Sequence, residues 1–428
     1  MTGNVVIAAG LLVPLFFQLS GGFYHSPLEP MYDSGGVILN VPLPISLLIV
    51  SVALLQYAKE SIFIHWKEAV AVLGIIAATT AIAGFEFRKL TLLAQFLIPA
   101  AALVLGRRFH DQRSLAVTWL VILVAFIPVQ LAIPVAMYNV LVLHHDMLFF
   151  SIYQHRQFVP VLFVAAYLIA LFSLYDDRRW RIPLIAATIV VGFYAVIAVS
   201  ILALALLFAG LVSLVFLRAS RFSCALSAAA IAACIAGAYL IGGEFSAKQK
   251  YAVIFSEKAA QEVGAGRSFQ LLPWLPVLRV PINIEHRIRD WKLYGDGILE
   301  SPQAALLGHP KPIERAVATS AHNYYLDLIY NFGLLAFLPL AMLIAITLRA
   351  LWIVRRTLRE DLALAGLALV VLFIVVVDSN FKVTLRQPYP GVLTFFLWGM
   401  LLSKLAAAKF RESPVKHNFL GATAQINR

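Results

Sequence analysis

Long apolar runs, each close to the length of a helix that crosses a bilayer, follow one another along the chain. A transmembrane helix needs about 20 consecutive apolar residues. Twelve segments come near that length: 4–20, 39–57, 68–85, 90–106, 115–137, 158–175, 182–199, 201–217, 223–243, 329–348, 362–378 and 389–408. Residues 182–217 are too many for one crossing, so we expect two helices that divide near Ser200. The pattern predicts an all-α polytopic membrane protein with about 12 transmembrane helices.

One polar segment is much longer than the others. Residues 244–321 separate the ninth apolar run from the tenth, and loops of this length are usually functional or disordered. Their aromatic and aliphatic content favours a folded loop, with short helices over 248–263 and 284–299. The predicted divisions of the chain are helices 1–9 in 1–243, the large loop in 244–321, helices 10–12 in 322–409, and a tail in 410–428.

The composition supports the membrane class. The chain has 61% apolar and 13% charged residues, whereas soluble domains carry about 25% charged residues. Polar residues are therefore too few to cover a water-facing globule, and the composition also excludes disordered and collagen-like classes. Cys224 and Cys234 lie in one apolar run, about 15 Å apart on a helix, which is beyond disulfide reach. The first run has no basic segment before it, so we expect a retained helix rather than a signal peptide.

The net charge of +12 changes its meaning once the basic residues are placed. In a soluble protein it would suggest a nucleic-acid partner. Here most Lys and Arg residues of short loops fall on the side of the N-terminus, and the rule that cytoplasmic loops are basic sets the topology. Both termini are then cytoplasmic, the large loop is outside, and no nucleic acid is expected. The basic residues of the short outer loops are only Arg88, Lys89, Arg156, Lys382 and Arg386.

The residues that enter the tenth run are the most suggestive of chemistry. They read Ala321-His322-Asn323-Tyr324-Tyr325 and continue to Gly333. His322 would lie at the boundary between membrane and water, and imidazole is the side chain best suited to take a proton near neutral pH. The alternative is an interfacial histidine within an ordinary aromatic belt.

This segment resembles a known family. His322-Asn323, nine residues and then Gly333 resemble the His-[Asn/Ser/Gln]-x9-Gly-x-x-Gly motif of the O-antigen ligase and O-antigen polymerase superfamily. Ala336 replaces the last glycine of that motif, and Asn331 replaces a frequent acidic residue. The layout of about twelve spans with a large outer loop between the ninth and tenth is similar to the family's.

Two further stretches in the large loop resemble the same family. Arg287 and Trp291 match an Arg-x-x-x-Trp helix, while Ser301-Pro302 and Leu307-Gly308-His309-Pro310 resemble the Pro…Gly-x-Gly turn that follows it. A Ser-Arg-Gly-like turn that many members carry between the seventh and eighth spans is absent, and the chain has Ser200-Ile201-Leu202 there.

The resemblance implies a GT-C type membrane glycosyltransferase at the outer face of the bacterial inner membrane. The donor would be a glycan on undecaprenyl diphosphate, with its polyprenyl tail among membrane lipid, and the enzyme would be inverting, metal-independent and free of cofactors. His322 would take the proton of an acceptor hydroxyl, and Arg287 and Arg156 would hold the diphosphate through charge-assisted hydrogen bonds. The implied substrate-binding residues are Arg289, Asn323, Gly333, Tyr324, His155 and Trp291.

Several alternatives stay open. Arg287 could be solvent-facing and paired with an acid, in which case Arg289 would take its place because the two point to different faces of a helix. Arg156 could be a membrane anchor. Lys382 and Arg386, near Asp378, could add to an anionic site, but a charged rim is expected for them, as it is for Arg88 and Lys89. No metal site is expected at His144-His145-Asp146, because adjacent residues rarely converge on one ion.

The function also has alternatives. A lipid A core acceptor would make the protein an O-antigen ligase, a lipid-linked glycan acceptor would make it a polysaccharide polymerase, and a protein acceptor would make it an oligosaccharyltransferase. A transporter of lipid-linked glycans would use the same arginines without a base, but transporters usually bury ionisable residues near the midplane. The predicted spans contain almost none.

Overall fold

The computed structural model describes residues 2–16, 87–138, 158–198, 200–255, 268–269, 278–279, 282–314, 317–318 and 320–412. These residues are almost entirely helical. The α-helices are α1 (Thr2–Leu12), α4 (Phe87–Arg108), α5 (Gln112–Tyr138), α6 (Val159–Leu174), α7 (Arg181–Ile197), α8 (Ile201–Leu217), α9 (Arg221–Phe255), α11 (Ile282–Leu299), α12 (Pro302–Leu307), α13 (Tyr324–Ile353), α14 (Thr357–Glu360), α15 (Leu362–Leu372), α16 (Ser379–Phe381) and α17 (Pro388–Glu412).

Short helices of other types and one small strand pair complete the fold. The 3-10 helices are η1 (Val13–Leu15), η2 (Arg178–Trp180) and η4 (Thr384–Arg386), and η3 (Phe373–Asp378) is a π-helix. Strands β1 (Ser268–Phe269) and β2 (Leu278–Arg279) pair antiparallel, with Ser268 opposite Arg279.

Six described helical segments are long and apolar enough to cross a membrane. They are Gln112–Ala132, Arg178–Ile197, Arg221–Leu240, Tyr324–Ile353, Leu362–Phe381 and Tyr389–Lys409. Shorter apolar helices span Gly3–Leu12, Val159–Leu174 and Ile201–Leu217. The chain is therefore a mostly helical protein with the helices of a membrane protein, as predicted. The predicted runs 39–57 and 68–85 lie outside the described residues, so the total of twelve spans stays a prediction.

The predicted division near Ser200 is confirmed. Helix α7 ends at Ile197 and α8 begins at Ile201. The Ser200 hydroxyl accepts a hydrogen bond from the backbone N–H of Ala203 at 3.4 Å, which satisfies a donor that the first turn of a helix otherwise leaves unpaired. The apolar run is thus broken by a capped helix start rather than by a polar loop.

The first of the two short helices predicted for the large loop differs from the structure. Residues 248–255 continue α9, which is one helix of 35 residues, so they do not form a separate short helix, and residues 256–263 lie outside the described residues. The second predicted helix, 284–299, is confirmed as α11, and α12 follows directly after Ser301.

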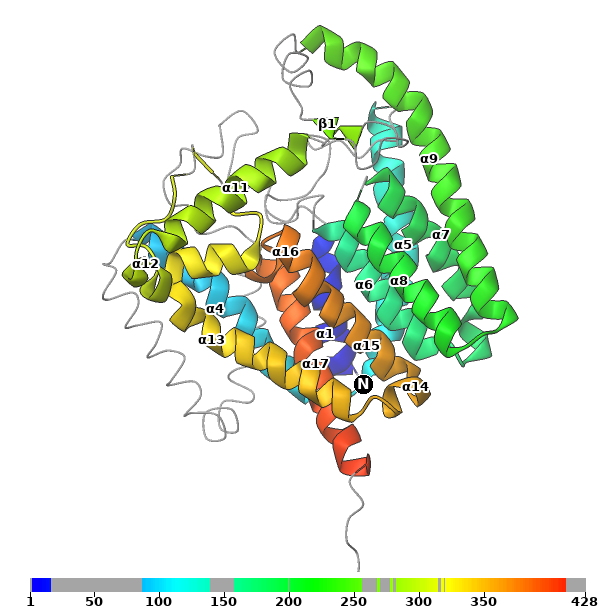
Figure 1. Ribbon diagram of the computed structural model, residues 1–428. Coiled ribbons are helices and arrows are strands. Elements are labelled where there is room, and N and C mark those ends of the chain that lie inside the picture. The colour runs from blue at the N-terminus through cyan, green and yellow to red at the C-terminus, as the bar shows by residue number, and fades with distance from the viewer. Residues whose placement is uncertain are drawn as a thin grey trace, which may run out of the picture.

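The helices run back and forth between two ends of a bundle (Figure 1). One end holds α14 and the N-terminus, and the other holds α11, α12 and α16. Residues predicted for inner loops meet at the first end, where Arg113 pairs with Asp177 at 2.6 Å and Arg218 donates to the carbonyls of Arg359 and Glu360. Polar loops of the same predicted side therefore gather at the same end.

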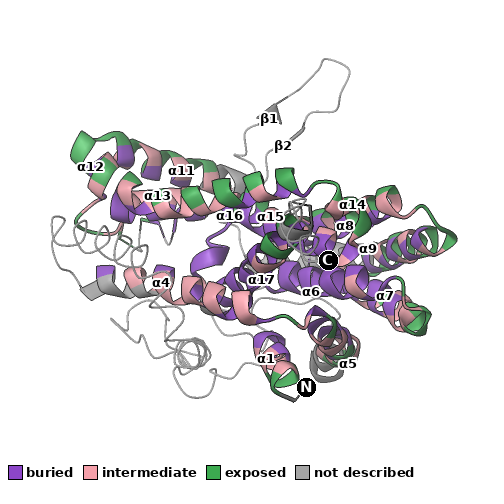
Figure 2. Ribbon diagram, turned by 90° about the horizontal axis from the view of Figure 1, so that it is seen from below, coloured by how far each residue is buried: buried purple, intermediate pink, exposed green. Residues whose placement is uncertain are grey.

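Close packing in the middle of the bundle fixes the helices that reach the second end. Helix α6 is buried along nearly its whole length (Figure 2) and lies against α5, α7, α8 and α15, as expected for a helix that is apolar on every side. Helices α4 and α17 approach so closely that a Cβ on Gly106 would lie 1.9 Å from the carbonyl oxygen of Phe396. Small residues allow such backbone contact between membrane helices.

Candidate functional site at one end of the bundle

Four parts of the chain meet at the end that holds α11 and α16. They are α11, the first turn of α13 with the residues before it, the segment from η3 to η4, and the start of α4. The sequence predicts outer loops in these parts of the chain. Arg287, His322 and the pair of cations Lys382 and Arg386 come from three separate parts of the sequence and are thereby brought to one site.

His322 has an unusual backbone conformation. Its φ is 48°, and it is the non-glycine residue with positive φ in the described part of the chain. Such a conformation costs free energy and persists where the surroundings hold it, often at functional sites. The backbone N–H of His322 donates to the Ser320 hydroxyl at 3.3 Å. The half-buried imidazole has no hydrogen-bond partner among the described residues, so it is available to a ligand.

The surroundings favour the neutral form of the His322 imidazole. Burial is the main cause that lowers the pKa of His322 below 6.5, and the positive charges of Arg287 and Arg386 lower it further. The Asp290 carboxylate acts in the opposite direction. A neutral imidazole can accept a proton, whereas an imidazolium cannot.

Arg287 and Arg289 face different sides of α11, as predicted, and Arg287 is the one that faces the site. Arg287 is half-buried, and burial is the main cause that lowers its pKa, while Asp378 opposes the shift. It forms no ion pair with any described residue. The Arg289 side chain is 68% exposed and contacts Asp290 at 3.4 Å. The alternative of a solvent-facing, acid-paired arginine therefore fits Arg289 and not Arg287.

Trp291 lies one turn after Arg287 on the same side of α11. Its ring is 5.9 Å from that of Phe381, and its buried indole N–H has no hydrogen-bond partner in the described ranges. Trp291 therefore stands beside Arg287 with an unused donor, which is compatible with the predicted contact to substrate.

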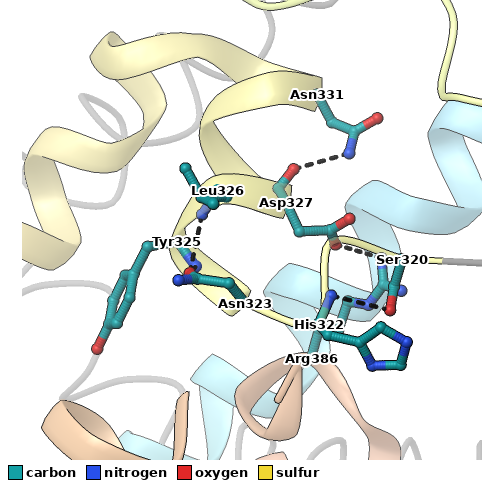
Figure 3. Close-up of polar contacts among 8 residues, drawn as sticks. All are labelled: Ser320, His322, Asn323, Tyr325, Leu326, Asp327, Asn331 and Arg386. Atoms are coloured by element: carbon teal, nitrogen blue, oxygen red, sulfur yellow. Dashed lines mark hydrogen bonds and ion pairs between the residues drawn. The ribbon is translucent and has the colours of Figure 1, made fainter. Parts of the chain in front are cut away.

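Asn323 and Tyr324 hold the start of α13. The Asn323 side-chain oxygen accepts from the backbone N–H groups of Tyr325 at 2.9 Å and Leu326 at 3.1 Å (Figure 3), which makes it the N-cap of the helix. Tyr324 is buried, with its ring 5.2 Å from that of Phe96. Both residues thus have a structural task next to His322, and their contact with substrate stays a prediction.

Gly333 breaks α13, and its predicted contact with substrate stays a prediction. Its φ is 79° within a helix that otherwise continues to Ile353. A Cβ on Gly333 would lie 2.2 Å from the carbonyl oxygen of Leu306, and a Cβ on Gly308, with φ 81°, would lie 2.5 Å from the backbone nitrogen of Phe332. The turn after α12 and the break in α13 therefore fit into each other through two glycines, so the two stretches that resemble family motifs are in direct contact.

Substitution of Gly333 by alanine should lower stability clearly. The left-handed conformation and the collision with Leu306 should together cost about 2 kcal/mol or more of unfolding free energy. Gly295→Ala is the matched control, because a Cβ there meets nothing within 4 Å and alanine is the better helix former. Thermal unfolding in detergent measures both variants. Equal melting temperatures would contradict the close backbone contact between Gly333 and Leu306.

The neighbourhood of His309 ties three elements together. The His309 ring stacks on Tyr330 at 4.1 Å and its Nε2 lies 2.9 Å from the carbonyl oxygen of Gly297 in α11. Its own carbonyl accepts from the Lys89 ammonium of α4 at 2.8 Å. The position of α11 relative to α13 is therefore fixed at the end of α11 that lies away from Arg287.

The charged rim predicted for Lys382, Arg386 and Lys89 is wrong, because all three side chains are buried. Lys382 is 5% exposed and lies 3.1 Å from Asp378, and Arg386 is 9% exposed and pairs with buried Asp327. Lys89 is also buried. Burial lowers the pKa of Lys382, and the Asp378 carboxylate opposes this effect. Buried charges are tolerated because they are paired.

Sequence reasoning overlooked Asp327 and Asp378 as the partners of these cations. Two signals were present. The cations lie on the side where basic residues are scarce, and each acid stands at the end of an apolar helix, where an ionisable residue needs a partner.

Some predicted site residues lie outside the described residues. These are Arg156 and His155, together with His144, His145 and Asp146. In the described ranges, no group of three or more His, Cys, Asp and Glu residues is arranged to hold a metal ion.

The class that fold and site define is a helical protein with helices long and apolar enough to cross a membrane and with a cationic, histidine-containing site at one end of its bundle. Comparison with known proteins adds no narrower class, since no protein-family model and no curated protein matches the chain. A narrower function has to be argued from the site residues.

Proposed function

We propose that the protein is a glycosyltransferase of the O-antigen ligase type, which moves a glycan from undecaprenyl diphosphate to an acceptor hydroxyl at the outer face of the bacterial inner membrane. The observation that carries the proposal is the pairing of two groups in one site. A half-buried imidazole with a lowered pKa neighbours the guanidinium of Arg287, which has no acidic partner among the described residues. The first group suits a general base, and the second suits a phosphate anion.

The proposed transfer reaction uses His322 and Arg287 in two different roles. The acceptor hydroxyl gives its proton to His322 while its oxygen attacks the reducing-end carbon of the donor glycan. The bond between that carbon and the diphosphate oxygen breaks, and the electron pair leaves with the diphosphate. Arg287, together with Arg156 as predicted from the sequence, offsets the developing negative charge. Attack from the side opposite the leaving group inverts the configuration.

The positions of the ionisable residues favour an enzyme over a transporter. Asp327 lies in the first turn of α13, and Asp378 lies close to the end of the segment Leu362–Phe381. Both acids and their partners Arg386 and Lys382 therefore belong to the bundle end and not to its middle. A site at the membrane surface can accept a water-soluble glycan while the lipid tail stays in the bilayer.

The test is transfer by the purified protein in nanodiscs. The donor is an undecaprenyl-diphosphate-linked glycan, and three reactions contain lipid A core, a second lipid-linked glycan, or no acceptor. Mass spectrometry of a glycan–lipid A core product supports the ligase, and a lengthened lipid-linked glycan supports the polymerase. If neither product forms while the same donor crosses proteoliposome membranes, the protein is a transporter and the proposal fails.

The orientation of the chain gives a separate prediction. In a background without Cys224 and Cys234, Leu299→Cys at an 81% exposed position of α11 should react with a membrane-impermeant maleimide added to spheroplasts. Arg355→Cys, at the opposite end, should react only after permeabilisation. The reverse labelling pattern would place the site in the cytoplasm, where the proposed reaction has no acceptor.

A further inference from the structure

We infer that the buried Asp327–Arg386 ion pair positions His322, and that both residues act on the reaction through His322 without touching the substrate. The inference rests on the proposed function for the role of His322 as base. The structural part, namely that the pair fixes the backbone and the charge around position 322, stands without it.

The pair anchors the peptide that precedes His322. Asp327 is 1% exposed in the first turn of α13, and its carboxylate accepts from the guanidinium of Arg386 in η4. The same carboxylate accepts from the backbone N–H of Ala321. Ala321 is completely buried and directly precedes His322. The Asp327 carboxylate thus joins α13 to η4 (Figure 3), and it also holds the residue before His322.

The backbone of His322 needs such an anchor because its conformation is strained. A residue with a side chain adopts positive φ when its neighbours hold it there. On one side of His322, the Ser320 hydroxyl and the Asp327 carboxylate hold residues 320–322. On the other side, Asn323 caps α13 and its amide donates to the side-chain oxygen of Asn380 at 3.4 Å. The direction of the imidazole is therefore set by a small network, of which the Asp327–Arg386 pair is the buried part.

The pair also controls the charge that His322 faces. The charged groups that act on His322 are Arg287 and Asp290 from α11 and Arg386 from η4. Asp327, the partner of Arg386, lies in the first turn of α13. Farther along, Asp378 and Lys382 pair with each other. Because Asp327 is paired with Arg386, it offsets part of the positive charge that the imidazolium formed during transfer would face. Without Asp327 this positive charge would be larger, and proton transfer to His322 would be harder.

The pH profile of transfer distinguishes this role from a merely structural one. Asp327→Asn keeps an oxygen that can accept from Ala321 but leaves Arg386 unneutralised. Its rate at neutral pH should fall about tenfold, and the acid limb of kcat/KM should move down by about one pH unit, as expected for a like charge close to a titrating group. The double variant Asp327→Asn with Arg386→Gln removes both charges and should return the limb to its original pH. Loss of rate with an unmoved limb in Asp327→Asn would overturn the inference.

A second measurement needs no transferase activity. In a background without Cys224 and Cys234, His322→Cys is treated with anionic and with cationic methanethiosulfonate reagents. The anionic reagent should react faster, and Asp327→Asn should raise the anionic-to-cationic rate ratio about threefold or more, because a charge close to the thiolate acts on both reagents. The double variant should restore the ratio. If the ratio does not change, the inference fails, whereas a changing ratio in a protein without any transfer activity would refute only the proposed function.

The experiment stays decisive if Asp327→Asn fails to fold. Arg386→Gln alone leaves the Asp327 charge in place and should lower the reagent ratio, the opposite direction from Asp327→Asn. Thermal unfolding identifies the variants that are folded. A raised or unchanged ratio in folded Arg386→Gln would contradict the assignment.

Discussion

Replacement of His322 by alanine should lower the rate of glycosyl transfer by orders of magnitude while donor binding is retained. The imidazole is half-buried, has no hydrogen-bond partner among the described residues, and has a lowered pKa, so at neutral pH it is a base with a free lone pair. A positioned general base contributes about 10²–10⁴-fold to a rate. The His322→Ala rate should fall by a factor in that range, as measured by product formation with saturating donor and acceptor.

The control for this variant is His110→Ala, since His110 is an exposed histidine in the loop between α4 and α5 at the other end of the bundle. It should keep full activity. Binding of the lipid-linked donor to His322→Ala, measured by thermal stabilisation, should equal that of the unaltered protein. Full transfer by His322→Ala would show that another group accepts the proton.

The pH dependence has a definite sign. A lowered pKa means that the neutral form of His322 persists to lower pH than that of an ordinary histidine. The activity that depends on the free base should therefore be complete at neutral pH and should decline only as the pH falls through a value below 6.5. A decline centred above 6.5 would mean that the titrating group is not His322 in this environment.

Loss of Arg287 should have an effect of similar size, and loss of Arg289 should have almost none. Arg287 is half-buried and lacks an acidic partner in the described part of the chain, whereas Arg289 is exposed beside Asp290. Removal of a donor that stabilises developing charge costs about 10²–10³-fold in rate. Arg287→Ala should lose this factor in kcat/KM and should bind the donor more weakly, because the diphosphate loses a charged partner.

The Arg289→Ala variant is the matched control for Arg287→Ala. Arg289→Ala removes the same side chain from the same helix two residues away, so it controls for net charge and for helix stability. Arg287→Lys should recover only part of the loss, since an ammonium cannot form the paired hydrogen bonds of a guanidinium. An equal loss of kcat/KM in the Arg287 and Arg289 variants would mean that the total positive charge of α11, and not one arginine, governs activity.

The helices could be predicted from the sequence because a bilayer imposes one strong rule. Each crossing must satisfy its own backbone hydrogen bonds and must be apolar over its length, so runs such as 115–137 and 362–378 are visible without any tertiary information. The division at Ser200 was visible for the same reason, since the run 182–217 has 36 residues and exceeds one crossing. The continuation of α9 beyond residue 243 could not be predicted, because the length limit for a crossing does not apply to the polar part of a helix that follows its apolar run.

The site could be predicted only where its residues are close in sequence. The periodicity of α11 separates Arg287 from Arg289, but both faces of that helix carry polar residues, so the inward side is decided by α13 and η3. The pair Asp378–Lys382 has helical spacing and was open to detection. The pair Asp327–Arg386 joins residues 59 positions apart, and the burial of Arg386 follows from the packing of η4 against α4 and α13.

The fit between Gly308 and Gly333 has a consequence for exchanging parts of the protein. Each glycine makes room for the backbone around the other, so the segment that contains α11 and α12 cannot be transplanted on its own. A chimera that takes this segment from another protein would need the complementary opening in the helix that corresponds to α13, or the donor's copy of that helix as well. The unit to exchange is therefore the segment with α11 and α12 together with the first half of α13.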